Sequence, residues 1–171
     1  MINFLHDQLA SLQEKGLYRI LREVEGPQSS RITIDGMEVL QFSSNDYLGL
    51  ANHPLVKEAA KEAIDRYGSG AGASRLVCGN LVLNGLLENK IARLKKKETG
   101  LLFSTGYMAN LGVISTLMGE GDLIFSDALN HARIVDACRM SRAKTMVYPH
   151  KDTEYLEKEL GQSSHYRQKL I

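Results

Sequence analysis

The sequence predicts an α/β protein in which an N-terminal helical arm and a small hairpin precede part of a mostly parallel, helix-covered sheet. Three observations support this class: wholly apolar runs alternate with helical patterns after residue 100, an Asp-Gly pair separates two alternating runs, and amphipathic helices fill much of the remainder. Strands that are apolar at every position are buried on both faces, which is typical of parallel sheets. We expect residues 1–45 to form the arm and hairpin, and residues 46–171 to form the first part of a larger sheet domain.

The arm should begin with a helix over Leu9–Arg22, because leucine and isoleucine recur there at helical spacings between charged residues. This helix is expected to break near Gly26–Pro27. Asp35–Gly36 then separates two alternating apolar runs, an arrangement that favours a tight hairpin turn.

The middle of the chain carries two further helical patterns. One follows Pro54, a residue that the first turn of a helix tolerates, and ends at Gly68. The other covers residues 83–94 and ends in three lysines, which we interpret as a solvated helix end. The glycine-rich run Gly68–Ala73 follows a helix and not a strand, so it lacks the context of a nucleotide-binding loop and is interpreted as a flexible connection.

The last 70 residues show a β-α-β-α-β order. We expect strands at 101–103, 123–125 and 145–148, helices at 108–118, 132–140 and 154–160, and the start of another strand at 169–171. A final strand without a helix to cover it suggests a fragment of a longer protein; the alternative is a complete domain that ends in an edge strand.

The composition is that of an ordinary globular domain, with 43% hydrophobic and 24% charged residues. Because 21 basic residues face 20 acidic ones, no net field favours nucleic acid or an anionic membrane. We find neither a signal peptide nor a membrane-spanning run and expect a cytoplasmic location. Cys78 and Cys138 are too few for a disulfide scaffold and lack the spacing of a metal site, so both are expected to be buried.

Two turns at one edge of the predicted sheet contain candidate ligand-binding residues. Gly106 and Tyr107 lie where a strand leads into a helix, and the free N–H groups of a helix start suit a phosphate. His131 lies in the next such turn, at the edge where ligands of open α/β sheets gather. Taken alone, each signal is weak, because such turns also contain ordinary helix caps.

Four motifs in fixed order strengthen this interpretation: Ser43–Leu50, Gly70–Gly79, Ser104–Tyr107 and Ser126–His131. In this series the chain closely resembles the α-oxoamine synthases, which are pyridoxal-phosphate enzymes of fold type I that join an amino acid to an acyl thioester. The resemblance runs from about Leu9 to the last residue. It implies that the sheet belongs to the large domain of that fold.

The resemblance also implies roles for particular residues. Gly106 and Tyr107 match the turn that holds the phosphate of pyridoxal 5′-phosphate, and His131 matches the histidine that stacks on the pyridine ring during catalysis. Arg19 resembles an arginine at the end of the acyl substrate, although Arg22 is close enough for the alignment to slip. Asn45 resembles an active-site asparagine. The run 68–79 resembles a segment at a subunit interface, which implies a homodimer.

The family's Schiff-base lysine, its pyridinium-pairing aspartate and a second active-site histidine match no residue of this sequence, so we expect the 171 residues alone to be inactive. Within the family, Gly72–Asn80 favours the branch that condenses L-alanine with a pimeloyl thioester of CoA or acyl carrier protein, with loss of carbon dioxide, on the way to biotin. Ser126–His131 fits the branch that uses glycine and acetyl-CoA equally well. A non-catalytic dimerisation fragment is the remaining alternative.

Overall fold

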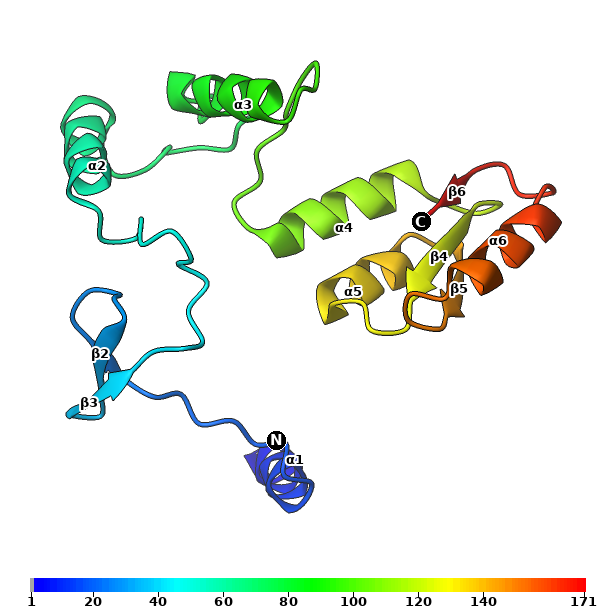
Figure 1. Ribbon diagram of the computed structural model, residues 1–171, viewed down its shortest axis with the longest axis horizontal. Helices are drawn as coiled ribbons and strands as arrows, with labels where there is room; N and C mark the ends of the chain where they lie inside the picture. The colour runs from blue at the N-terminus through cyan, green and yellow to red at the C-terminus, as the bar shows by residue number, and fades with distance from the viewer. Residues whose placement is uncertain (1) are drawn as a thin grey trace. The chain divides into compact units, whose positions relative to one another are not determined.

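The computed structural model describes residues 2–171, which fold as two compact units divided between Gly72 and Ala73. The predicted domain boundary after residue 45 stays a prediction. The first unit contains α1 (Ile2–Glu14), β1 (Val24–Glu25), β2 (Arg31–Ile34), β3 (Met37–Leu40) and α2 (Pro54–Tyr67) (Figure 1). The second contains α3 (Val82–Leu94), α4 (Gly106–Leu117), β4 (Leu123–Asp127), α5 (Ala132–Met140), β5 (Lys144–Tyr148), α6 (Thr153–Gln162) and β6 (Lys169–Leu170).

Helix α1 starts and stops earlier than expected, so the predicted helix over Leu9–Arg22 is wrong in both bounds. The reason for the stop is Gly16, whose φ of 64° is left-handed and suits glycine best. The N–H of Leu17 donates to the carbonyl of Leu12 at 2.8 Å, and the N–H of Gly16 donates to that of Gln13 at 3.0 Å. This pair of hydrogen bonds is the Schellman end of a helix.

The predicted hairpin is confirmed. Strands β2 and β3 pair antiparallel, with Ile34 opposite Met37. Asp35 and Gly36 form the turn with φ values of 51° and 77°, and two successive positive values are what a type I′ turn requires. Strand β1 adds a third, unpredicted strand by pairing with β2.

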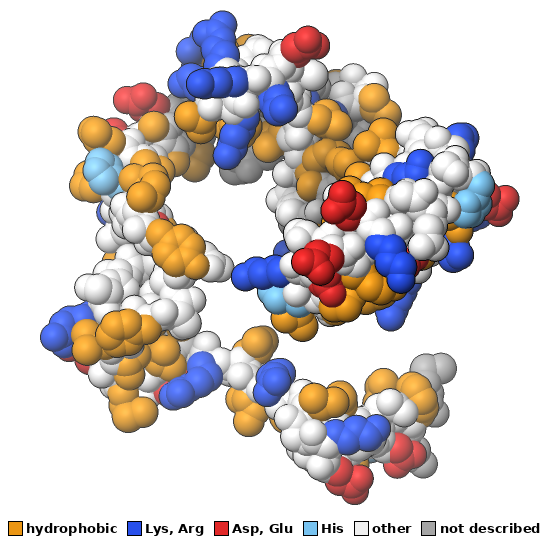
Figure 2. All heavy atoms as spheres, turned by 45° about the vertical axis from the view of Figure 1, so that its right-hand side comes forward, with side chains coloured by type: hydrophobic (Ala, Val, Ile, Leu, Met, Phe, Trp, Pro, Cys, Tyr) orange, Lys and Arg blue, Asp and Glu red, His pale blue; other side chains and the backbone are white. Residues whose placement is uncertain are grey.

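Helix α2 has both ends that the sequence predicts. Nδ1 of His53 accepts a hydrogen bond from the N–H of Leu55, Pro54 is the first helical residue, and Gly68 closes the helix with φ 79°. Its apolar side is nevertheless open, since Leu55 is 74% and Ile64 54% exposed. Figure 2 shows such hydrophobic side chains on the surface in orange. Local signals therefore form this helix without a buried face.

The second unit is built on the predicted parallel sheet, which is confirmed in the order β5-β4-β6 with β4 in the centre. Leu123, Ile124 and Phe125 of β4 are almost wholly buried. Ile124 faces a core made with α4 and α5 that includes Ile114, Met118, Ala137 and Cys138. Side chains alternate along a strand, so Leu123 and Phe125 point to the other face, where α6 lies (Figure 1).

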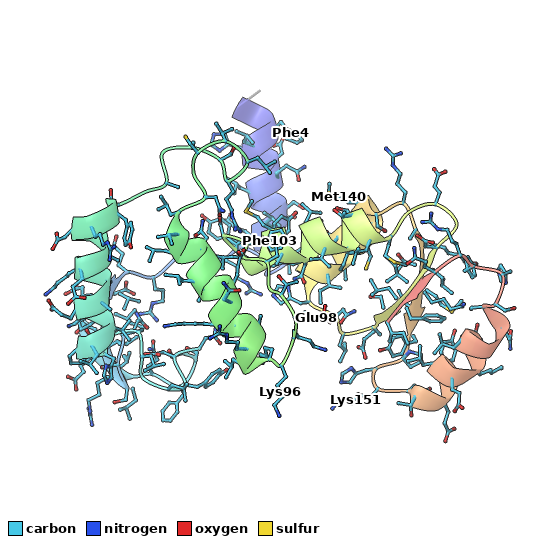
Figure 3. All side chains as sticks on the ribbon, turned by 90° about the horizontal axis from the view of Figure 1, so that it is seen from above. Phe4, Lys96, Glu98, Phe103, Met140 and Lys151 are labelled. Carbon is cyan, nitrogen blue, oxygen red and sulfur yellow. The ribbon has the colours of Figure 1, made fainter. Side chains whose placement is uncertain are left out.

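The expected strand at 101–103 does not form, and that prediction is wrong. The backbone groups that would join a ladder are engaged by side chains instead. The N–H of Leu102 donates to Oε1 of Glu88 at 2.8 Å, and its carbonyl accepts from the guanidinium of Arg75 at 3.0 Å. Arg75 and Glu88 also pair with each other at 2.8 Å. Phe103, labelled in Figure 3, packs its ring against Gly112 of α4.

A buried carboxylate lies at the amino edge of the parallel sheet, where β4 begins. The side chain of Asp122 is fully buried and accepts two hydrogen bonds from Arg167, at 2.9 and 2.6 Å. The N–H of Gly119 donates to it as well, at 2.9 Å. The Arg167 hydrogen bonds and this amide lower the pKa of Asp122 to about 2. The Asp122 carboxylate is therefore ionised at neutral pH.

The two cysteines behave differently from each other. Cys138 is buried as expected, and burial raises the pKa of its thiol. Cys78 is exposed, so that expectation is wrong; it lies in a tight turn where the N–H groups of Val77 and Gly79 both donate to the carbonyl of Ser74.

Among residues 2–171, no helix combines the length and apolar character needed to cross a lipid bilayer.

Candidate functional site

The carboxyl edge of the sheet gathers the loops that carry the candidate residues of the second unit. Strand β4 leads into α5 at this edge, and α4 returns to β4 at the other edge, so both helices begin near the carboxyl ends of the strands (Figure 1). A cavity of about 280 Å³ opens here. Asn110, Asp127 and Asn130 give it polar groups, whereas Val113, Ile134 and Leu170 are among its apolar lining.

Gly106 and Tyr107 form the first turn of α4. Thr105 caps this helix through Oγ1, which accepts a hydrogen bond from the N–H of Met108 at 3.1 Å. The N–H groups of Gly106 and Tyr107 have no acceptor within the helix and lie at its positive end. A Cβ atom at Gly106 would meet nothing within 4 Å, so there is open space beside these donors. The arrangement suits an anion.

His131 is the N-cap of α5. Its Nδ1 accepts a hydrogen bond from the N–H of Arg133 at 3.2 Å. An accepting nitrogen carries no proton, so the neutral ring has its proton on Nε2. The residue is exposed, and the ring therefore remains accessible beyond its role as a cap.

The loop that carries His131 is held by groups that sequence reasoning missed. Asp127 accepts hydrogen bonds from the N–H groups of Leu129 and Lys151 and contacts His150 across the neighbouring loop. Asn130 donates through Nδ2 to Oγ of Ser126 at 3.0 Å. The N–H of Leu129 and the His150 ring lower the pKa of Asp127. The sequence could have indicated the bond from Asp127 to the N–H of Leu129, because aspartate often caps a turn amide two residues later. No local pattern, however, predicts the contact between Asp127 and His150.

The cavity is lined by residues next to the two candidate turns. Asn110 lies one helical turn after Gly106, and Asn130 directly precedes His131; both line the cavity. Gly106, Tyr107 and His131 themselves do not line it. The starts of α4 and α5 thus share one edge of the sheet, while the roles of the three residues remain predictions.

Arg19 and Asn45 belong to the first unit. Arg19 lies in the exposed segment between α1 and β1. Asn45 is exposed in the loop before α2, and its Oδ1 is 3.5 Å from the hydroxyl of Tyr47, at the limit of a hydrogen bond. Within residues 2–171, no three or more His, Cys, Asp or Glu side chains gather in a way that could hold a metal ion.

Solved structures with the same architecture define the class of this fold. A serine palmitoyltransferase from S. paucimobilis, solved with PLP–myriocin bound, matches 92% of this chain and 42% of its own with a TM-score of 0.82 and 32% identity. The predicted fold class, part of the large domain of a fold-type-I transferase, is thereby confirmed. Residues 37–171 also match the family described as aminotransferase class I and II. The chain belongs to this family.

Curated relatives narrow the likeness further. The chain is 51% identical over 162 residues to 8-amino-7-oxononanoate synthase of Geobacter sulfurreducens, covering 95% of this chain and 41% of that protein. It is 54% identical over 157 residues to the synthase of the same name from Geotalea daltonii, covering 92% and 40%. The resemblance to the α-oxoamine synthases is confirmed. The chain spans about two fifths of the length of these relatives.

Proposed function

We propose that this chain belongs to an 8-amino-7-oxononanoate synthase, an acyltransferase that condenses L-alanine with pimeloyl-CoA or a pimeloyl carrier protein and releases carbon dioxide in biotin biosynthesis. The observation that carries the proposal is the identity of about one half to synthases of this name across more than nine tenths of the chain. The ordered motifs that end in Gly79, Tyr107 and His131 support it from the sequence side.

Pyridoxal 5′-phosphate is the cofactor of the proposed enzyme, and the second unit fits it. The open space at Gly106 and the first-turn amides of α4 would hold the phosphate group through hydrogen bonds and the helix dipole. Tyr107 and the exposed ring of His131 lie at the same sheet edge and would contact the planar ring. When bound, this cofactor supplies an electron sink for the carbanion formed at the amino acid's Cα.

The chain's own residues then act by orientation. His131, held as the cap of α5 by the N–H of Arg133, would present a fixed imidazole face against the cofactor ring. A fixed imidazole would orient the cofactor ring for chemistry at the amino acid's Cα. Asn45 would contact the amino-acid substrate, and Arg19 would pair with the carboxylate at the far end of the pimeloyl chain, where a guanidinium is well suited to an anion.

Other parts of the proposal concern the whole protein. We propose a cytoplasmic homodimer in which the glycine-rich run 68–79 lies near a subunit interface. The lysine that holds the cofactor covalently matches no position in this sequence, so the 171 residues alone would show no amino-acid-dependent turnover.

The test is a substrate comparison with the full-length protein. Steady-state rates are measured with L-alanine plus pimeloyl-CoA and with glycine plus acetyl-CoA, and we expect a higher kcat/KM for the first pair. Preference for the second pair would assign the protein as a 2-amino-3-ketobutyrate CoA ligase. A protein that dimerises but turns over neither pair would support the non-catalytic alternative.

A further inference from the structure

The carboxylate of Asp127 joins the loops that follow two neighbouring strands. In its own loop it accepts a hydrogen bond from the N–H of Leu129 at 2.7 Å. In the loop after β5 it accepts one from the N–H of Lys151 at 3.2 Å and lies 2.9 and 3.0 Å from Nδ1 of His150. We call this set of contacts the Asp127 clamp. Since two of its partners come from the other loop, the clamp fixes one loop against the other.

The clamp has the features of a strong interaction. The Asp127 side chain is 17% exposed, so little water competes for its oxygens, whereas His150 is 45% exposed. Its partners lower the pKa of Asp127, and the carboxylate is ionised at neutral pH. Because Nδ1 of His150 faces two carboxylate oxygens, this nitrogen carries a proton and donates it. Hydrogen bonds to an ionised acceptor are stronger than those between neutral groups.

The same loop leads directly to His131. The N–H of Ala128 donates to the carbonyl of Tyr148 at 2.9 Å, and the N–H of Asn130 donates to the carbonyl of Asp127 at 3.0 Å. These bonds leave the backbone between Asp127 and His131 little freedom. On the other side, Lys151 has a φ of 59°, a backbone conformation that residues other than glycine rarely adopt and that surrounding contacts must hold.

We propose that Asp127 and His150 are positioning residues for His131: by joining the two loops, the clamp fixes where the imidazole is presented at the carboxyl edge of the sheet. This inference rests on the proposed function, in which His131 contacts the cofactor ring. Neither Asp127 nor His150 needs to touch substrate or cofactor, and each acts through the backbone of the His131 loop.

Matched substitutions in the full-length protein separate positioning from bulk. His150→Asn keeps an N–H donor near the position of Nδ1, whereas His150→Leu keeps side-chain bulk and removes the donor. Asp127→Asn retains an oxygen for the N–H of Leu129 but turns an NH₂ group toward the second loop. It serves as the second variant if His150→Leu folds poorly.

Three measurements report whether the Asp127 clamp still positions His131. The ¹⁵N chemical shifts of the His131 ring in the cofactor-free protein report whether Nδ1 still accepts the Arg133 N–H. The visible circular dichroism of bound pyridoxal phosphate reports its orientation, and steady-state kinetics separate kcat from the KM of the acyl thioester.

We expect His150→Leu and Asp127→Asn to shift the His131 ring signals, change the visible circular dichroism and lower kcat roughly 10- to 100-fold, as small misplacements do. The thioester KM should stay within about twofold, and His150→Asn should resemble the wild type. Unchanged readouts in both disrupting variants, or equal damage by His150→Leu and His150→Asn, would overturn the positioning role. A wild-type protein that binds no cofactor would instead refute the proposed function, and the ring signals would still test the clamp.

Discussion

The two units of this chain differ in what holds their elements. In the first unit, Ile32 is the only hydrophobic residue among the described side chains that is buried, and α2 presents Leu55 and Ile64 to solvent. In the second unit, β4 is enclosed by helices and contributes Leu123, Ile124 and Phe125 to the core. Caps, turns and the hydrogen bonds of a small sheet define the elements of the first unit, whereas packing dominates the second. An amphipathic sequence is thus sufficient to predict a helix but not to predict what covers it.

The prediction with the largest expected effect compares the stability contributed by a packed core residue with that contributed by an exposed residue of the first unit. In the 171-residue chain, Ile124→Ala removes a side chain from the core and should lower the free energy of unfolding by about 2–5 kcal/mol. The matched change Ile64→Ala removes the same atoms from an exposed face and should cost less than about 0.5 kcal/mol. Urea denaturation with amide hydrogen exchange would measure both. A similar cost for Ile64→Ala would mean that its face is covered in solution.

A second prediction concerns the buried charge at the amino edge. Because the folded pKa of Asp122 is lowered to about 2, its ionised form stabilises the fold above the unfolded pKa of about 3.9. That contribution is lost as the pH falls through the folded value. Asp122→Asn should therefore destabilise the protein at pH 7, and the difference from wild type should narrow between about pH 4 and pH 2.

Thermal denaturation across this pH range measures the gap. The control is Asp136→Asn, which removes the same charge from an exposed pair with Arg139 at 3.7 Å. A gap for Asp122→Asn that stays constant down to pH 2 would contradict the role of the ionised carboxylate.

The smallest effect tests local support inside the packed unit. Thr105→Ala removes the cap of α4 and should cost about 1 kcal/mol, while Thr105→Ser, which keeps the hydroxyl, should cost much less. Hydrogen exchange at the first turn of α4 would report the change. A cost near zero for the alanine variant would show that packing alone holds the start of this helix.

Features with a local cause were predictable from sequence. Asp35–Gly36 specifies its turn, Pro54 and Gly68 bound α2, and the apolar run of β4 indicates a buried strand. The stop at Gly16 also had a local signal, which the spacing of leucines outweighed. These elements depend on backbone angles and side-chain periods that neighbours in the sequence determine.

Features that need distant partners were not predictable in this way. The segment at 101–103 has the pattern of a strand, but its backbone groups bond to Arg75 and Glu88 instead. Likewise, the contact between Asp127 and His150 spans 23 residues and leaves no periodic trace. At the candidate site, residue types and their order indicated Gly106, Tyr107 and His131, whereas the groups that hold the His131 loop come together only in the folded chain.

The cap formed by His131 has a consequence for proton transfer. A proton that arrived at Nδ1 would displace the N–H of Arg133 and loosen the first turn of α5. Further along, this helix places Ala137 and Cys138 in the core, so its start is coupled to the packing of the sheet. While the cap is intact, the neutral ring can therefore donate a hydrogen bond through Nε2–H, but it has no free nitrogen lone pair with which to accept a proton.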